Sequence, residues 1–180
     1  MKHLIALALA AALALSCAGL AMAEAQTYDL FAVGDKAMLT LTIDREPLYI
    51  TIDEALTELG VSHAFVETEG VAPCMVAIAK SDVIDGESLG ELGEEALETL
   101  KAIAAEQFDN PEILTGTVNG ITYIAAKNFE ENANINTIFT IEKGYFIQTT
   151  QYHEDFSALT EEDGAFALEV ISGIGSRALE

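Results

Sequence analysis

Two-residue turns between short strand-like segments limit the fold of this chain more than any other feature of its sequence. Strand-forming residues fill Glu112–Val118 and Ile121–Phe129, and Asn119-Gly120 separates the two runs. Asn and Gly both tolerate the positive φ angles of a type I′ turn, whose twist matches that of paired strands. The spacing therefore predicts a β-hairpin over residues 112–129.

A second turn of this kind lies further along the chain. Lys143-Gly144 joins the strand-like runs Ile135–Glu142 and Tyr145–His153. Parallel strands need crossover connections of about a dozen residues or more, which such tight turns exclude. We therefore expect the C-terminal half to form an antiparallel meander of about four strands.

Earlier runs with strand-like patterns are separated by turn residues: Gln26–Val33, Ala37–Ile43, Ser62–Glu67 and Cys74–Lys80. In the second run Leu39, Leu41 and Ile43 alternate with threonines, the period of a half-buried strand. Thr51-Ile52-Asp53-Glu54 has the pattern of a capping box and predicts a short helix that ends at Gly60. The segment Leu48–Ile52 also fits an extended conformation.

Two amphipathic segments predict helices. The longer is Ser88–Phe108, which Asn110-Pro111 ends and whose apolar face comprises Leu89, Leu92, Ala96, Leu97, Leu100, Ile103, Ala104 and Phe108. The run Leu159-Thr160-Glu161-Glu162-Asp163 caps the other, which carries Phe166, Leu168, Val170, Ile171 and Ile174. These elements indicate an α+β fold: an antiparallel β-sheet, with a meander in its C-terminal half, covered by helices. We expect residues 24–180 to form a single domain.

Residues 1–23 differ in composition from the rest of the chain. A short basic start, Met1-Lys2-His3, precedes the apolar run Leu4–Leu15, and Ala21-Met22-Ala23 has the small-x-small pattern of a cleavage site. This order is typical of a secretory signal peptide, so we expect cleavage after Ala23 and a location outside the cell or in the cell envelope. No later apolar run approaches the ~18–20 residues that cross a bilayer, which argues against stable membrane insertion after cleavage.

The two cysteines bear on processing and stability. Cys17 lies where bacterial lipoproteins carry a lipidated cysteine, but Ala14 and Leu15 reverse the usual order before it, so lipidation is the lesser alternative. Once the signal peptide is removed, Cys74 is the single cysteine, and no intramolecular disulfide can form. Its neighbours Met75-Val76-Ala77-Ile78 predict a buried strand, in which a free thiol acts as a small apolar group.

The charge of the chain excludes some partners. Thirty acidic residues against eight basic ones give a formal net charge of −22. Such a surface opposes nucleic acids and anionic membranes, and it permits cationic partners. The sequence also lacks a glycine-rich phosphate loop, so we expect no nucleic-acid partner and no cofactor.

The order of elements in the second half carries a family resemblance. Phe108-Asp109-Asn110-Pro111 leads into Val118-Asn119-Gly120-Ile121-Thr122-Tyr123, and Gly144-Tyr145-Phe146-Ile147 leads to Leu159–Asp163, Phe166 and Ile171. In this arrangement the chain resembles the PsbP/Mog1-like family, in which helices sandwich an antiparallel sheet. The resemblance implies a binding or accessory domain without a shared set of catalytic residues.

One segment matches a catalytic motif. Gly86-Glu87-Ser88-Leu89-Gly90 has the G-x-S-x-G pattern of a nucleophile elbow, and Asp109 and His153 follow in the order that a hydrolase uses. However, Ser88 and Glu91 also form a capping-box pattern, which predicts that Ser88 caps a helix. The residues between Lys80 and Ser88 also separate this turn from the preceding strand. We therefore keep a small secreted serine hydrolase as an alternative function.

Other candidate sites are weaker. A Cys74–His153 pair has the residue types of a thiolate–imidazolium dyad, but its cysteine lies in a strand predicted to be buried. Two histidines and one thiol after processing do not supply a Cys/His zinc site, so we expect no metal. Asp82, Asp85 and Glu87 do not fit the spacing of an EF-hand loop. They leave a weak calcium site, and with it a calcium-dependent adhesion or scaffold module, as a second alternative.

Aromatic residues gather in and after the meander. Tyr123, Tyr145, Tyr152 and Phe156 are the candidates for contacting a partner, although core packing explains most aromatic residues in such a sheet. The expected function is thus that of an exported, non-enzymatic binding or accessory domain. Its expected partner is a protein or another component of the envelope, which the sequence does not name.

Overall fold

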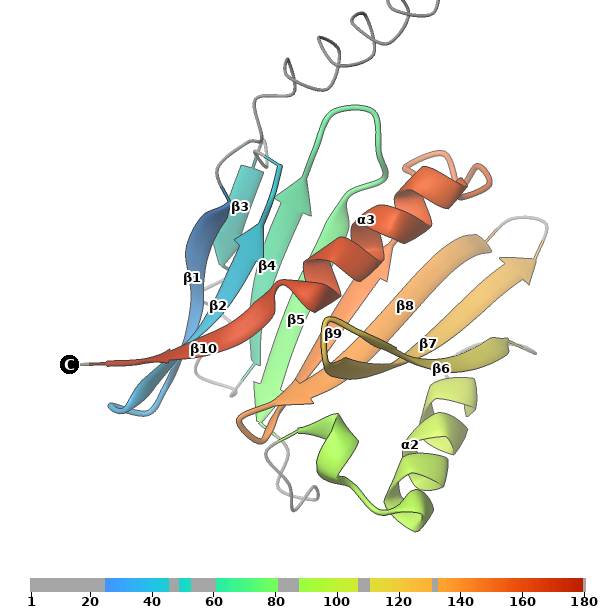
Figure 1. Cartoon of the computed structure of the whole chain (residues 1–180). Coiled ribbons are helices and arrows are strands. Elements are labelled where there is room, and N and C mark those ends of the chain that lie inside the picture. The colour runs from blue at the N-terminus through green and yellow to red at the C-terminus, as the bar shows by residue number, and fades with distance from the viewer. Residues whose placement is uncertain are drawn as a thin grey trace, which may run out of the picture.

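The computed structural model describes residues 25–45, 49–52, 61–80, 88–106, 111–130 and 133–179. The elements in chain order are β1 (Gln26–Val33), β2 (Ala37–Ile43), β3 (Tyr49–Ile52), β4 (Val61–Glu67), β5 (Cys74–Lys80), the 3₁₀ helix η2 (Leu89–Glu91), α2 (Glu94–Glu106), β6 (Glu112–Val118), β7 (Ile121–Glu130), β8 (Ala133–Glu142), β9 (Tyr145–Gln151), α3 (Glu161–Ser172) and β10 (Ile174–Ala178) (Figure 1). The structure contains both helices and antiparallel strands, which confirms the predicted α+β class.

The strands form two antiparallel sheets where the sequence predicted one. The larger has the order β3-β4-β5-β9-β8-β7-β6, and the smaller has the order β1-β2-β10. The predicted meander is β6–β9, and both tight turns have the expected geometry. Asn119 and Gly120 have φ of 49° and 83°, and Lys143 and Gly144 have φ of 53° and 73°. These left-handed pairs explain why both connections need only two residues.

Alternation along the strands of the larger sheet gives it two different faces. One face packs with β1, β2 and α3 into a core that includes Leu39, Leu41, Val66, Val76, Ile147, Phe166 and Ile171. Figure 1 shows α3 lying across this face, with β10 leading from its end to β2. The side chains of β7 and β8 that point the other way pack with η2 and α2 in a second cluster around Leu89, Ala104, Ile124 and Phe139. The larger sheet thus has packing partners on both faces.

The predicted helix over Ser88–Phe108 is wrong in its first turn. Regular α-helix begins at Glu94, after a 3₁₀ turn that ends where Leu92 becomes extended. Ser88 makes no side-chain capping hydrogen bond, so the predicted capping box does not form there. Instead the backbone of Ser88 pairs with Glu142 in an isolated bridge, and Leu89 inserts into the core with 3% exposure. Because Leu89 is buried against the sheet, this segment forms a 3₁₀ turn instead of the first turn of the predicted α-helix.

The buried face of α2 is also narrower than predicted. Ala104 is buried and Leu97 and Leu100 are half-buried, but Ile103 is 51% exposed and Ala96 is exposed. Phe108 lies outside the described residues.

The second helix is capped as predicted. Thr160 is the N-cap of α3, and its side chain and that of Asp163 each bond the other's backbone N–H. The helix stops at Ser172, however, and Ile174 begins β10 by pairing with Leu41 of β2. The sequence did not predict this strand, because Gly173 before it and Gly175 within it match the ordinary end of a helix.

Some predictions fall outside the described residues: the signal peptide, Cys17, most of the helix proposed up to Gly60, Asp82, Asp85, Glu87 and Asp109. The start of that helix segment is described, and Tyr49–Ile52 is the strand β3. Within the ranges that the structure describes, no helix is long and apolar enough to cross a membrane.

Candidate functional site

A cavity of about 490 Å³ lies between α3 and the strands β6, β7 and β8. Its sheet wall consists of Leu114, Tyr123, Ala125, Lys127, Asn136 and Ile138. Its other wall, from α3 and the loop before it, consists of Leu159, Thr160, Glu161, Gly164, Ala165 and Leu168. The walls are mainly apolar, with a few polar groups, which is the usual composition of a small-molecule site.

The register of the strands sorts the sheet wall into a polar end and an apolar end. Lys127 lies opposite Asn136, and Asn136 lies opposite Gln151, so these residues form one row across β7, β8 and β9. Two residues along the strands, about 7 Å away, the next row contains Ala125 and Ile138. The sheet wall of the cavity is therefore polar at Lys127 and Asn136 and becomes apolar at Ala125 and Ile138.

The polar row is mostly buried and incompletely paired. Asn136 is 4% exposed, and its Oδ1 has no hydrogen-bond partner among the described residues. Gln151 is fully buried, and its Nε2 donates to the carbonyl oxygen of Ala72 at 3.0 Å, while its Oε1 also lacks a described partner. Half-buried Lys127 forms no ion pair with any described residue. Unsatisfied buried polar atoms cost about 1–3 kcal/mol each, so this row departs from ordinary core packing.

Two glycines shape the cavity. A Cβ atom on Gly164 of α3 would meet nothing within 4 Å, so this part of the helix wall is open. At Gly116 a Cβ atom would lie 2.6 Å from Cζ of Tyr123, which means that the tyrosine ring lies directly over the glycine in the neighbouring strand. Tyr123 therefore lines the cavity from a position that a larger residue at 116 would disturb.

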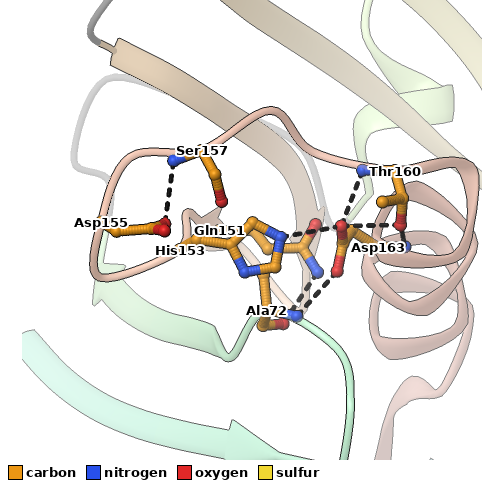
Figure 2. A network of polar contacts seen from close by, with 7 residues as sticks. All are labelled: Ala72, Gln151, His153, Asp155, Ser157, Thr160 and Asp163. Atoms are coloured by element: carbon orange, nitrogen blue, oxygen red, sulfur yellow. Dashed lines mark hydrogen bonds and ion pairs between the residues drawn. The ribbon is translucent and has the colours of Figure 1, made fainter.

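A network of polar contacts holds the start of α3 against the sheet (Figure 2). The Asp163 carboxylate is 1% exposed and accepts hydrogen bonds from the backbone N–H of Ala72 at 2.7 Å and from that of Thr160 at 2.7 Å. The Thr160 hydroxyl also donates to it at 2.8 Å, and Nε2 of His153 lies 3.1 Å away. Burial by itself would raise the pKa of Asp163, but these hydrogen bonds together lower it below its ordinary value.

Cys74 is a buried structural residue, as predicted. Its side chain is fully buried, and burial, with the negative charge of Asp163 as a second cause, raises the pKa of the thiol to about 12. His153 contacts the carboxylate of Asp163, and the nearby negative charge disfavours the thiolate that a cysteine nucleophile requires. The environment is thus the opposite of the one that activates a dyad.

The structure does not bring Ser88 and His153 together, and the third hydrolase candidate, Asp109, lies outside the described residues. Ser88 pairs with Glu142, which lies opposite Tyr145 at the start of β9. His153 follows Gln151 at the other end of this strand, and the length of β9 corresponds to about 20 Å. A nucleophile and its base must lie within hydrogen-bond distance, about 3 Å apart.

The four aromatic partner candidates divide into two pairs. Tyr152 and Phe156 are 39% and 45% exposed, and their rings stack with centroids 5.7 Å apart. By contrast, the ring of Tyr145 packs against that of Phe31 with centroids 5.3 Å apart, and Tyr123 lines the cavity. The loop between β9 and α3, which carries Tyr152 and Phe156, is therefore the exposed candidate surface for contact with a partner. In that loop Phe156 has a φ of 54°, and its N–H donates to the carbonyl oxygen of His153.

Within the described ranges, no group of three or more His, Cys, Asp or Glu side chains is placed to hold a metal ion. Sequence reasoning missed Lys127, Asn136 and Gly164. A signal for Lys127 exists, because it shares its alternation with Tyr123 and Ala125 and so faces inward on β7. A lysine in phase with core residues marks a buried polar site.

Comparisons with known proteins add no family assignment. No protein-family model matches the chain, no curated protein matches it, and no solved structure matches it.

Proposed function

We propose that this protein is an exported, non-enzymatic binding domain that holds a small amphipathic molecule between α3 and the strands β6–β8. The observation that carries the proposal is the cavity of about 490 Å³, with its apolar walls and its polar row at one end. Small-molecule sites occupy about 300–1,000 Å³ and combine apolar walls with a few oriented polar groups.

Export is the second part of the proposal. The basic, apolar and small-x-small order of residues 1–23 supports cleavage after Ala23, which leaves residues 24–180 as the working domain in the envelope or the medium. The resemblance to the PsbP/Mog1-like family supports an accessory role, and the α+β architecture is compatible with it. N-terminal sequencing of the exported protein is expected to begin at Glu24, and Cys17→Ser is expected to leave processing unchanged.

The positions of the candidate nucleophiles support binding over catalysis. Ser88 lies at the opposite end of β9 from His153, and Cys74 is buried with a raised pKa. Neither residue lines the cavity. Rapid labelling of Ser88 by a fluorophosphonate probe, lost in Ser88→Ala with the fold intact, would contradict this part of the proposal.

Gly164 offers a matched pair of variants for the cavity. Gly164→Phe places a ring in the open space beside the helix, whereas Gly164→Ala adds only a methyl group. With the amphipathic fluorescent probe 8-anilinonaphthalene-1-sulfonate, we expect saturable binding to the wild type and to Gly164→Ala, and at least tenfold weaker binding to Gly164→Phe. Cooperative unfolding and near-UV circular dichroism control for loss of the fold. Equal binding by all three proteins, or binding by none, would overturn the proposal.

A further inference from the structure

The strand β6 lacks the features that keep the edge of a sheet from pairing. It lies at one end of the larger sheet, and no described strand pairs with its outer side (Figure 1). Native proteins block free edges with short strands, bulges, prolines or charged side chains, lysine above all. β6 has seven residues in unbroken register with β7, and it contains neither proline nor lysine. Its outer edge is therefore open to another strand.

The other sheet edges of the described ranges carry such features. β3 has only four residues. β1 has a register shift between Asp29 and Phe31, which marks a bulge. β10 has five residues and carries Arg177, whose guanidinium group bonds the carboxylate of Asp29. The open edge of β6 is thus specific to this strand.

The turn after β6 identifies the backbone groups that this edge presents. Across a type I′ turn the flanking residues, here Val118 and Ile121, form a hydrogen-bonded pair. Hydrogen-bonded and non-hydrogen-bonded pairs alternate along antiparallel strands, so the backbone N–H and C=O groups of Ile113, Thr115 and Thr117 point away from β7. An extended backbone matches this spacing of donors and acceptors, so the partner that fits is an added strand.

The charge of the edge selects which strand is added. Residues 113–126, which form most of β6 and β7, contain no Asp, Glu, Lys or Arg, whereas 21% of the whole chain is charged. A cationic strand would gain nothing from this uncharged stretch. Two copies of a chain with a formal net charge of −22 repel each other least where neither presents carboxylates. The uncharged edge therefore suits a second copy of the same chain.

Two-fold pairing of β6 with its copy also places the charges at its ends apart. When Thr115 lies on the symmetry axis, Ile113 lies opposite Thr117 of the second copy, and Glu112 lies opposite Val118. The two Glu112 residues then lie at opposite ends of the strand pair, about 20 Å apart, and the Debye length at physiological salt is about 8 Å. Their repulsion is largely screened.

Exposed apolar side chains at this end of the sheet would be covered by the same pairing. Leu114 is 40% exposed and lines the cavity, and it lies opposite Gly116 of the second copy. The Tyr123 ring lies over Gly116, so Leu114 would pack on the Tyr123 ring of the second copy. On the other face of the sheet α2 contacts β6 and β7 and carries Ile103, which is 51% exposed. Apolar groups thus flank the edge on both faces.

We infer that this protein forms a two-fold symmetric dimer in which the two β6 strands pair antiparallel, centred on Thr115, and join the larger sheets into one. The dimer covers Leu114 at the side of the cavity where the sheet of one copy ends. The inference goes beyond the proposed function, and it holds with or without a ligand in the cavity.

Sedimentation-velocity ultracentrifugation of the exported protein tests the dimer. We expect reversible association that weakens at least tenfold in Thr115→Pro, because proline removes the outward N–H at this position and leaves the bonds between β6 and β7 in place. Thr115→Val is the matched control: it keeps the N–H and the β-branched shape and should associate like the wild type. A wild type that stays monomeric up to about 1 mM, or equal association of all three proteins, overturns the inference.

Charges placed on the symmetry axis test the register. Thr115→Glu and Thr115→Lys each bring two like charges together, so each variant alone should associate at least tenfold more weakly than the wild type. An equimolar mixture of the two places opposite charges across the axis and should regain association. Thr115 is exposed, so both monomers should remain folded, which cooperative urea unfolding checks. A mixture that associates no better than its components overturns the pairing centred on Thr115.

The dependence on salt separates this dimer from one held by ion pairs. Association of two negatively charged copies through an uncharged edge should strengthen as NaCl rises from about 0.05 M to about 0.5 M, because the ions screen the repulsion between the copies. Association that weakens over this range would indicate an ion-paired interface elsewhere on the chain and would overturn the inference.

Discussion

The carboxylate of Asp163, in the first turn of α3, accepts a hydrogen bond of 2.7 Å from the backbone N–H of Ala72, which lies 91 positions earlier in the chain. This bond joins the C-terminal helix to the segment that enters β5. Because α3 forms one wall of the cavity, the bond also sets the position of the candidate binding site.

Loss of the Asp163 side chain should destabilise the protein more than loss of an ordinary helix cap. Asp163→Ala leaves the fully buried N–H of Ala72 unpaired and removes the cap, so we expect a loss of about 2–4 kcal/mol in the free energy of unfolding. Thr160→Ala is the matched control: it removes the capping hydroxyl and keeps the bond to Ala72, for a loss of about 1 kcal/mol. Urea unfolding measures both, and equal losses would show that the long-range bond contributes little.

The same carboxylate predicts a dependence of stability on pH. The pKa of Asp163 is lower in the folded protein than its ordinary value, so its stabilising contribution is complete above the unfolded pKa of about 3.9 and is lost as the pH falls through the folded pKa. The difference in unfolding free energy between the wild type and Asp163→Asn should therefore be constant near neutral pH and shrink below about pH 4. A difference that stays constant down to pH 2 would contradict the lowered pKa.

Two glycines of the α3 region should respond to alanine with opposite signs. Gly164 lies inside the helix and a Cβ atom there meets nothing within 4 Å, so Gly164→Ala should stabilise the protein by about 0.5–1 kcal/mol. At Gly173 a Cβ atom would collide with the backbone carbonyl oxygen of Thr42, and the carbonyl of Gly173 accepts a hydrogen bond from the N–H of Thr42. Gly173→Ala should therefore destabilise by more than about 2 kcal/mol. Thermal and urea unfolding check the pair, and equal effects would contradict the close contact of β2 with the end of α3.

The buried thiol predicts an alkaline limit to stability. The pKa of Cys74 is raised from its ordinary value of 9.0 to about 12, so the folded state retains a proton that the unfolded state loses. Stability should fall as the pH rises from about 9 towards 12, by at most about 1.4 kcal/mol per pH unit from this group. Cys74→Ala should remove that part of the slope.

Burial of the Cys74 side chain also predicts slow reaction with thiol reagents. At pH 8 such a reagent should modify Cys74 only in urea, and rapid modification of the native protein would contradict its burial.

The sequence by itself determined the elements whose cause is local. Asn119-Gly120 and Lys143-Gly144 fix tight turns through their own backbone preferences, so the meander β6–β9 could be predicted. The cap at Thr160 is equally local, because the groups that satisfy each other lie three residues apart.

Only the tertiary structure decided between equivalent local patterns. Ser88 and Thr160 both precede an acidic residue by three positions, yet only Thr160 forms the cap, because Ser88 pairs with Glu142 and Leu89 is drawn into the core. Likewise β10 forms because its residues pair with β2 across a large separation in sequence.

The candidate site is also a feature that only the tertiary structure decided. Lys127 and Asn136 become neighbours only through the register of β7 with β8, and the opposite wall exists only because Asp163 holds α3 over them. Local sequence preferences set turns and caps, which need a few adjacent residues. The cavity depends on long-range pairing and on the packing of a helix against a sheet, whose energies no short stretch of sequence contains.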